Sequence, residues 1–291
     1  MAGFGTPAID GTLDAAYGAA VSVQTVRTAF GSSTNGNLIG GGGSELNGLY
    51  LANNGSTLFV LLTGNVESNG NTLYILIDDV SNAAGPNVLP NTPGKDDLFN
   101  TNKLGGATMP VGFGPEWGFV FKGFTNGAIG GPSDYDYVYS IANFVTGTSV
   151  APALDQPTLA LVNPATGTDS TAGYPITFAL DNSNIAGVNG GTNPDWAIVA
   201  ETPATVTTGY EIAIPLSAIV PATTGNLKIL AYISSGDGTF AANQFLPPLV
   251  PAIGNVGNPP PGGYLFPTLG LTAASYSLVV PMSAPSWNLY E

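Results

Sequence analysis

The chain contains no cysteine and no histidine among its 291 residues. Disulfides, a thiolate nucleophile, an imidazole base, and histidine or cysteine metal ligands are therefore all excluded. Paired carboxylates are the catalytic groups that remain, and the close pairs are Asp78/Asp79, Asp96/Asp97 and Asp134/Asp136. Adjacent strand residues point to opposite faces, so Asp78 and Asp79 should not converge on one substrate. We expect a protein that is not an enzyme.

Basic side chains are also scarce. Five lysines and arginines stand against 19 acidic residues, and the formal net charge is −14. A nucleic-acid surface neutralises phosphates with clustered lysine and arginine, which this chain lacks. Anionic membrane surfaces are disfavoured for the same reason, and no apolar run reaches the roughly 18 residues that could span a bilayer. The sequence therefore predicts neither a nucleic-acid partner nor membrane insertion.

Charged residues of both signs make up only 8% of the chain, whereas glycine (40 residues) and proline (24 residues) are abundant. Helices held by pairs of Glu and Lys are not expected with so few charges. A hydrophobic fraction of 44% is enough to bury a core, which excludes a disordered chain.

Few charges and many Thr, Asn and Gly residues are typical of extracellular proteins. Met1 to Phe4 shows no signal peptide, so we interpret the chain as a mature or trimmed form of an extracellular or cell-surface protein.

The segment from Gly48 to Asp79 contains the clearest strand pattern. Three apolar, β-favouring runs lie within it: Leu49 to Ala52, Leu58 to Thr63 and Leu73 to Ile77. They are separated by Asn53-Asn54-Gly55 and Asn69-Gly70-Asn71, which are typical of tight hairpin turns. The pattern predicts an antiparallel meander of three strands that forms the core sheet.

Short strands with turn-rich connections continue along the rest of the chain. Period-two alternation predicts a hairpin of Trp117 to Lys122 with Tyr135 to Ala142. Further strands are expected at residues 19–26, 155–161, 174–180, 196–201, 209–215, 227–233 and 276–282, with one helical turn at 216–219. Residues 1–18 should form an extended N-terminal arm and turn, 247–267 a proline-rich surface coil, and 275–291 a C-terminal strand and tail. The economical architecture is one all-β domain, an antiparallel β-sandwich of jelly-roll type with long Gly, Asn and Pro-rich loops and very little helix.

Two regions of the chain resemble a known family. Pro7 to Tyr17, with the sequence PAIDGTLDAAY, is similar to the opening of family 9 carbohydrate-binding-module-like (DOMON-type) β-sandwiches, and Leu49 to Asp78 is similar to the strands that follow. Residues 43–46, 64–69, 209–217 and 242–248 add a closer similarity to bacterial exosortase-sorted (PEP-CTERM) surface proteins, whose sorting tail is not seen here. The resemblance implies a β-sandwich at the cell surface, with carbohydrate binding as one function.

Acidic residues in Asn and Gly-rich loops suit calcium, which binds carboxylates, amide oxygens and backbone carbonyls. The candidate ligands are Asp78, Asp79, Asp96, Asp97, Asp181 and Asp237. None of their loops has the EF-hand spacing. The alternative at each loop is an Asx turn, in which the side chain accepts a hydrogen bond from its own backbone. The sequence leaves both interpretations open.

Exposed aromatic side chains would stack on the apolar face of a sugar. Trp196, which follows an Asn and Gly-rich loop, is the tryptophan best placed for this role, and Tyr135 and Tyr137 share one face of a predicted strand. Trp117 alternates with two phenylalanines, which favours packing in the core. These residues support a calcium-dependent carbohydrate-binding module, with a polysaccharide as partner, as the alternative function.

Pairing of sheet edges between copies is the function that the sequence predicts first. Tyr276, Leu278, Val280 and Met282 form an alternating apolar stripe near the end of the chain. Such a strand can lie along a neighbour's sheet edge, where backbone hydrogen bonds provide affinity and alternate side chains fill pockets. We therefore expect a self-assembling structural protein that forms a fibre, sheath or matrix with copies of itself. The alternative is that the stripe is the last strand of its own sheet.

Overall fold

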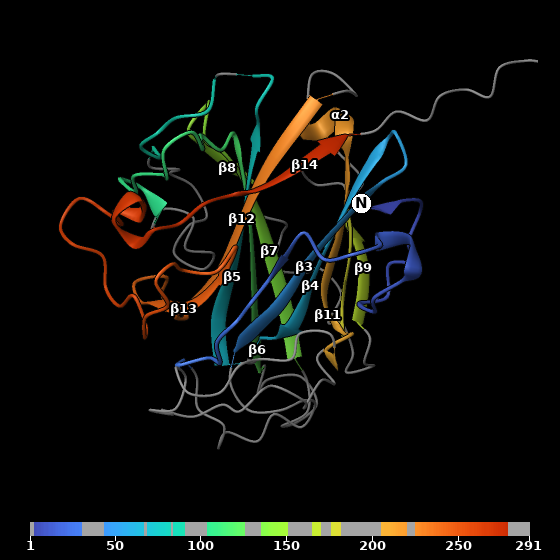
Figure 1. Ribbon diagram of the computed structural model, residues 1–291, viewed down its shortest axis with the longest axis horizontal. Helices are drawn as coiled ribbons and strands as arrows, with labels where there is room; N and C mark the ends of the chain where they lie inside the picture. Colours follow the sequence, from blue (N-terminus) through green and yellow to red (C-terminus); the bar gives the residue numbers. More distant parts are fainter. Residues whose placement is uncertain are drawn as a thin grey trace, which may run out of the picture.

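The structure is a computed structural model that describes residues 3–30, 44–66, 69–82, 84–90, 104–125, 135–150, 165–169, 176–181, 205–219 and 225–278. Within these residues the chain forms two seven-stranded sheets and only short helical turns. The sheets pack face to face (Figure 1). The prediction of an all-β sandwich with very little helix is confirmed, and the jelly-roll type stays a prediction.

We name the two sheets after a central strand of each. The β4 sheet has the order β1 (Gly3–Phe4), β3 (Glu45–Asn53), β4 (Thr57–Asn65), β11 (Gly209–Pro215), β10 (Ile176–Leu180) and β9 (Ala165–Asp169), and β2 (Ser22–Val23) also pairs with β3. The β5 sheet has the order β13 (Ala241–Leu246), β12 (Gly225–Ser234), β5 (Asn69–Asp79), β6 (Trp117–Thr125), β7 (Tyr135–Asn143) and β8 (Thr148–Val150), and β14 (Ala274–Leu278) also pairs with β12. All strand pairs are antiparallel except β1 with β3. The helical turns named below are η1 (Ala15–Tyr17), α2 (Leu216–Ile219) and η5 (Phe266–Leu269).

The hairpin predicted between the first two apolar runs is confirmed. Asn53 of β3 pairs with Leu58 of β4, and Gly55 in the turn has a positive φ of 87°. The Asn54 side chain accepts a hydrogen bond from the Thr57 backbone N–H at 3.0 Å. This side chain therefore closes the turn as an Asx motif does.

The predicted meander is wrong at its third strand. β5 lies in the opposite sheet between β12 and β6, and Asn69-Gly70-Asn71 begins this strand instead of forming a hairpin turn. By crossing over, β5 places Ile75 and Ile77 in the same buried cluster as Val60 of β4. Local propensity identifies a strand, but burial of its apolar face decides the sheet to which it belongs.

The main core lies between the two sheets and takes apolar side chains from both. Phe121 of β6 and Tyr210 of β11 come from opposite sheets, and their ring centroids are 4.3 Å apart. Aromatic pairs of this kind contribute about 1 kcal/mol beyond the area that they bury. The contact therefore helps to fix how the two sheets stack.

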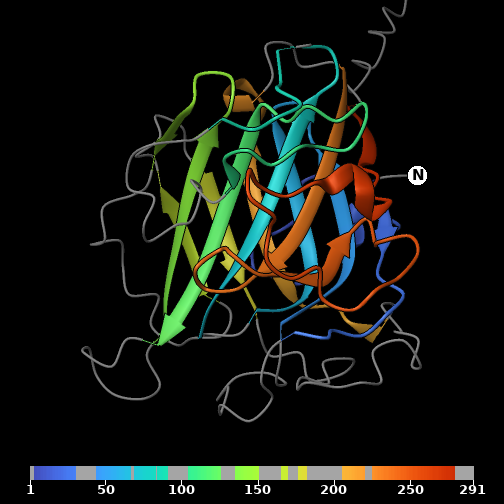
Figure 2. The same ribbon diagram turned by 90° about the vertical axis from the view of Figure 1, so that its left-hand side faces the viewer.

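A second buried layer covers the outer face of the β5 sheet, where loops run across the strands (Figure 2). Tyr232 of β12 stacks on Tyr74 of β5, with ring centroids 4.8 Å apart. The proline-rich segment 247–267 contains no regular strand, as predicted, but it is more than surface coil because its Leu249 and Tyr264 are buried in this layer. Burial on both faces explains why β5 is apolar at consecutive positions instead of alternating.

The remaining strand predictions differ in outcome. The strands expected at 117–122, 135–142, 209–215 and 227–233 are confirmed, as is the helical turn at 216–219. The strand expected at 174–180 starts at Ile176, and the one expected at 19–26 is only the two-residue β2. The strands expected at 155–161 and 196–201 lie outside the described residues. No helix within the described ranges has the length and apolar character needed to cross a membrane.

One edge of the sandwich is closed by side-chain amides. Residues 24–30 run beside β13, and we call this contact the β13 seam. Asn243 of β13 accepts a hydrogen bond from the Ala29 backbone N–H and donates one to the Arg27 carbonyl, both at 2.9 Å. Gln24 donates to the Phe245 carbonyl at 3.0 Å. The seam therefore covers the β13 edge with side-chain hydrogen bonds and not with a further strand.

Candidate functional site

The candidate site lies at the end of the sandwich where β5 ends and β6 begins. Asp78 and Asp79 are the last residues of β5, and both are buried. Asp78 shares the face of Leu76, which belongs to the outer layer, whereas Asp79 shares the inward face of Ile77. The two carboxylates therefore point to opposite sides of the β5 sheet, as expected for neighbours in a strand.

Each aspartate holds a different turn. Asp78 accepts a hydrogen bond from the Gly114 backbone N–H at 3.2 Å. One oxygen of Asp79 accepts hydrogen bonds from the backbone and hydroxyl of Ser81, at 3.1 and 2.6 Å, while its other oxygen, Oδ2, is buried without a hydrogen bond. Burial raises the pKa of Asp78 above its usual value, and the Gly114 N–H and the Lys228 charge limit that rise.

Glu116, which precedes β6, is a site residue that the sequence analysis missed. Its carboxylate accepts hydrogen bonds from the backbone N–H groups of Asp79 at 2.8 Å and Gly85 at 3.1 Å, so it ties the end of β5 to the following turn. Burial raises its pKa to about 7, with smaller contributions from the nearby charges of Asp78 and Asp79. A signal was present in the sequence, since Glu116 is an isolated acid directly before an alternating strand in a chain with few charges.

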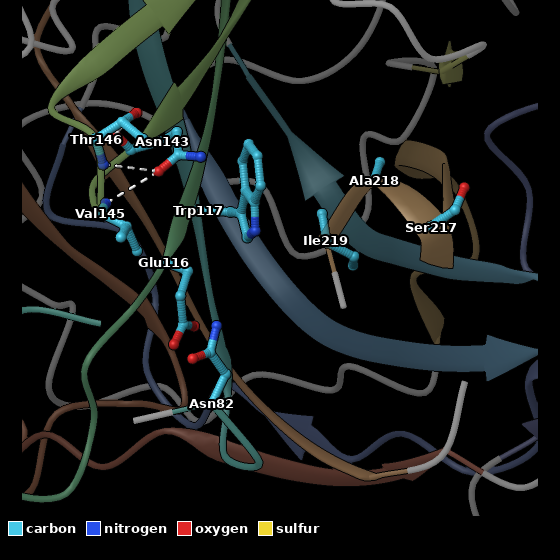
Figure 3. Close-up of a pocket in the computed structure, with 9 residues that line it drawn as sticks. All are labelled: Asn82, Glu116, Trp117, Asn143, Val145, Thr146, Ser217, Ala218 and Ile219. Atoms are coloured by element: carbon cyan, nitrogen blue, oxygen red, sulfur yellow. Dashed lines mark hydrogen bonds between the residues drawn. The ribbon is translucent and has the colours of Figure 1, made fainter. Parts of the chain in front are cut away.

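A cavity of about 300 Å³, which we call the Trp117 pocket, opens beside Glu116 (Figure 3). The indole of Trp117 lies between the β7–β8 turn on one side and α2 on the other. Polar groups of Asn82, Glu116, Asn143 and Ser217 line the same cavity. Asn143 Oδ1 accepts hydrogen bonds from the next turn, at 3.0 and 3.1 Å, so the amide group of this side chain is held in place. Trp117 packs partly against the core, as predicted, and it also lines a cavity, which was not predicted.

A second cavity of about 310 Å³, the Asp78 pocket, lies on the outer side of the β5 sheet and shares Asn82 with the first. It is lined by Asp78, Val80, Asn82, Gly85, Asn87, Gly112, Phe113, Gly114 and Lys228. Lys228 of β12 is paired in register with Asp78, and its ammonium group donates to the Gly112 carbonyl. The pocket therefore contains one negative and one positive side chain.

Of the other predicted calcium ligands, the two that the structure describes do not join this site. Asp237 lies in an exposed turn, where it accepts a hydrogen bond from the Thr239 backbone N–H at 3.1 Å, which is the Asx-turn alternative. Asp181 follows β10 in the β4 sheet, and Asp96 and Asp97 lie outside the described residues. Among the residues that the structure describes, no three acidic side chains are grouped so that they could hold a metal ion. Calcium binding stays a prediction.

The predicted sugar-stacking and assembly residues are only partly described. Trp196, Val280 and Met282 lie outside the described residues, and Tyr135 and Tyr137 are placed in β7 by backbone only. Tyr276 and Leu278 lie in β14, which pairs with β12 of its own sheet, and their side chains are buried in the main core. The Tyr276 hydroxyl accepts a hydrogen bond from Asn53 of the β4 sheet at 2.7 Å. These two side chains fill the core of their own chain and are not free to fill a neighbour's pocket.

Two of the segments that carry the family resemblance, residues 7–17 and 209–217, meet in space. Glu211 of β11 accepts hydrogen bonds from the backbone N–H groups of Asp10 and Gly11, at 2.9 and 2.8 Å, and from the Tyr17 hydroxyl at 2.5 Å. Burial raises the pKa of Glu211 to about 7, and these three hydrogen bonds limit the rise. Glu211 therefore fastens the N-terminal Asp10-Gly11 turn to the β4 sheet, which gives both segments a structural role.

Comparison with known proteins gave no match to a family model, to a curated protein or to a solved structure.

Proposed function

We propose that this protein is a non-enzymatic extracellular β-sandwich that binds a carbohydrate in the Trp117 pocket. The observation that carries the proposal is an indole lining a cavity together with the amides of Asn82 and Asn143. An indole offers a flat apolar surface for one face of a sugar ring, and amides pair with its hydroxyl groups. Of the described residues that line this cavity, Glu116 is the one acid, whereas glycoside hydrolysis ordinarily uses two carboxylates across a cleft. The lining thus favours binding over catalysis.

A polysaccharide pull-down or glycan array, run with calcium and with a chelator, tests this proposal. Trp117→Ala is expected to weaken binding about tenfold or more, because the stacking surface is lost. Asn143→Asp keeps the oxygen that holds the β7–β8 turn but removes the amide donor, so it should weaken binding without disturbing the turn. Thr268→Ala, at an exposed position in η5, is the matched control. The absence of any bound glycan in both conditions would contradict the proposal.

Self-assembly through the edge of β14 is the second candidate. β14 pairs with β12 on one side and with no other strand among the described residues, and Ala274–Leu278 carries no charged side chain that would block pairing. Since Tyr276 and Leu278 are buried, the β14 edge could bind a neighbouring copy through its backbone and the exposed Ser275 and Ser277.

Light scattering after size exclusion, with negative-stain microscopy, tests this candidate. Ser275→Lys places a charge at an exposed position of the β14 edge and should reduce the fraction of assembled protein. Ser217→Lys, in the exposed part of α2, adds the same charge elsewhere and should leave assembly unchanged. Monomers alone at high protein concentration would count against assembly.

A further inference from the structure

The Asp78 pocket holds two opposite charges that are neighbours without pairing to each other. Asp78 and Lys228 face each other across the β5 and β12 register, where Cβ atoms of paired residues are about 5 Å apart. Both side chains are on the outer side of the sheet, where they line one cavity of about 310 Å³. An ion pair within the strand pair would be the ordinary outcome for such a placement. Each head group instead binds the turn before Glu116, Asp78 through the Gly114 N–H and Lys228 through the Gly112 carbonyl.

Both charged groups keep unused hydrogen-bonding capacity. Asp78 is only 7% exposed, and its single hydrogen bond leaves the Oδ1 oxygen without a partner among the described residues. Lys228 uses one of the three N–H donors of its ammonium group. A buried carboxylate and an ammonium group therefore line the same cavity, and each can form further hydrogen bonds. Together they form a site with one negatively and one positively charged group.

We propose that the Asp78 pocket binds a small zwitterion, a free α-amino acid with a short side chain. The ammonium group of the ligand binds the Asp78 carboxylate, and its carboxylate binds the Lys228 ammonium group. A zwitterion pairs with both charged side chains while adding no net charge to the pocket, so it avoids the cost of burying an unpaired charge. Val80 and Phe113 supply an apolar wall for a small side chain, and Asn82 and Asn87 supply further polar groups.

Neighbouring residues limit the choice of ligand. Asp79 and the partly ionised Glu116 add negative charge near this end of the sheet, which disfavours a simple anion such as acetate. Lys228 disfavours a simple cation. An amino acid with a short side chain has few non-hydrogen atoms, and ligands of this size bind in the millimolar range or weaker unless every contact is near ideal. This proposal is independent of carbohydrate binding, because the two cavities share only Asn82.

Isothermal titration and ligand-observed NMR on the full chain, with L-alanine, acetate and methylammonium as separate probes at about 10 mM, test the proposal. L-alanine is expected to bind, while acetate and methylammonium each bind at least tenfold more weakly. Glycine betaine has the same charges but no N–H donors, and it should also bind more weakly than L-alanine. Equal responses to all four probes, or no response to L-alanine, would overturn the proposal. Neither outcome would bear on the carbohydrate-binding proposal, which the glycan experiment tests separately.

Substitutions of the two charged side chains test whether L-alanine binds in the Asp78 pocket. Asp78→Asn and Lys228→Met should each weaken L-alanine binding at least tenfold, whereas Lys228→Arg should retain much of it. Lys122→Met is the matched control, since Lys122 also donates to a backbone carbonyl, that of Gly236, but does not line this cavity. The unfolding transition of each variant shows whether it is folded, and the probe series on the unaltered chain remains decisive if one is not. Unchanged binding in both Asp78→Asn and Lys228→Met would place the ligand elsewhere and overturn the proposal.

Discussion

At the scale of single residues, two isolated glutamates hold the chain together at points where it turns. Glu211 binds the N-terminal turn through Asp10 and Gly11, and Glu116 binds the turn after β5. Each accepts at least two backbone N–H groups that have no strand or helix partner of their own. The sequence analysis singled out pairs of aspartates, yet the hydrogen bonds of the single Glu211 span about 200 residues, whereas that of Asp78 spans 36.

Glu211→Ala should destabilise the fold by about 2 to 4 kcal/mol, because two buried donors and one partly buried donor lose their acceptor at once. Urea denaturation followed by circular dichroism measures the change in free energy of unfolding. Tyr17→Phe removes only one of the three hydrogen bonds and should cost about 1 kcal/mol. A loss below about 0.5 kcal/mol for Glu211→Ala would mean that water or other groups replace the carboxylate.

At the scale of secondary-structure elements, the β13 seam shows how this fold covers a sheet edge with few charges. In natural proteins, exposed sheet edges often carry lysine or proline, which hinder pairing with another strand. Here residues 24–30 lie along β13, and the amides of Gln24, Asn243 and Asn255 bind the backbone. An amide side chain both donates and accepts, so one residue can satisfy both kinds of backbone group.

Asn243→Ala should loosen the seam, because the Ala29 N–H and the Arg27 carbonyl lose their partner. The expected cost is about 1 to 3 kcal/mol. Hydrogen exchange should also rise in residues 24–30 more than elsewhere. Asn226→Ala is the matched control, since Asn226 is exposed and bonds only to the surface hydroxyl of Ser277 by its side chain. Equal effects of the two variants would argue that the seam contributes little.

At the scale of the whole molecule, stability should fall as the pH rises from about 5 to 8. Burial raises the pKa of Glu116 and Glu211 from 4.5 to about 7 in the folded chain. The folded state therefore binds these protons more tightly than the unfolded state does. The resulting stability is fully present below pH 4.5 and is lost as the pH rises through 7. Deprotonation also brings the net charge to its full formal value of −14, which increases repulsion within the folded state.

Urea denaturation at several values in this pH range measures the slope. The double variant Glu116→Gln with Glu211→Gln removes both titrating groups and should flatten the dependence. Asp237→Asn serves as a control, because hydrogen bonds, chiefly from Ser235, lower the pKa of Asp237 and place its titration below this pH range. A stability that stays constant or rises with pH in the unaltered chain would contradict the prediction.

The class of fold and most of the strands follow from the sequence alone. Alternation identified β6 and β7, Asn-Gly turns identified the β3–β4 hairpin, and the scarcity of charge argued against helices held by Glu–Lys pairs. These are local properties, because side-chain periodicity and turn chemistry act over a few residues. The sequence also indicated Asp78 as a site residue, although as a calcium ligand and not as part of a pocket with Lys228.

Which elements lie together depends on tertiary packing and does not follow from the sequence pattern. β5 continued the pattern of β3 and β4, but burial of apolar faces placed it in the other sheet. Glu211 meets a turn 200 residues away in sequence, and Trp117 lines a cavity because α2 and the β7–β8 turn end beside it. Such contacts depend on the packing of distant segments, for which local propensity contains no signal. The site is therefore a product of how the two sheets stack, and the strands alone do not specify it.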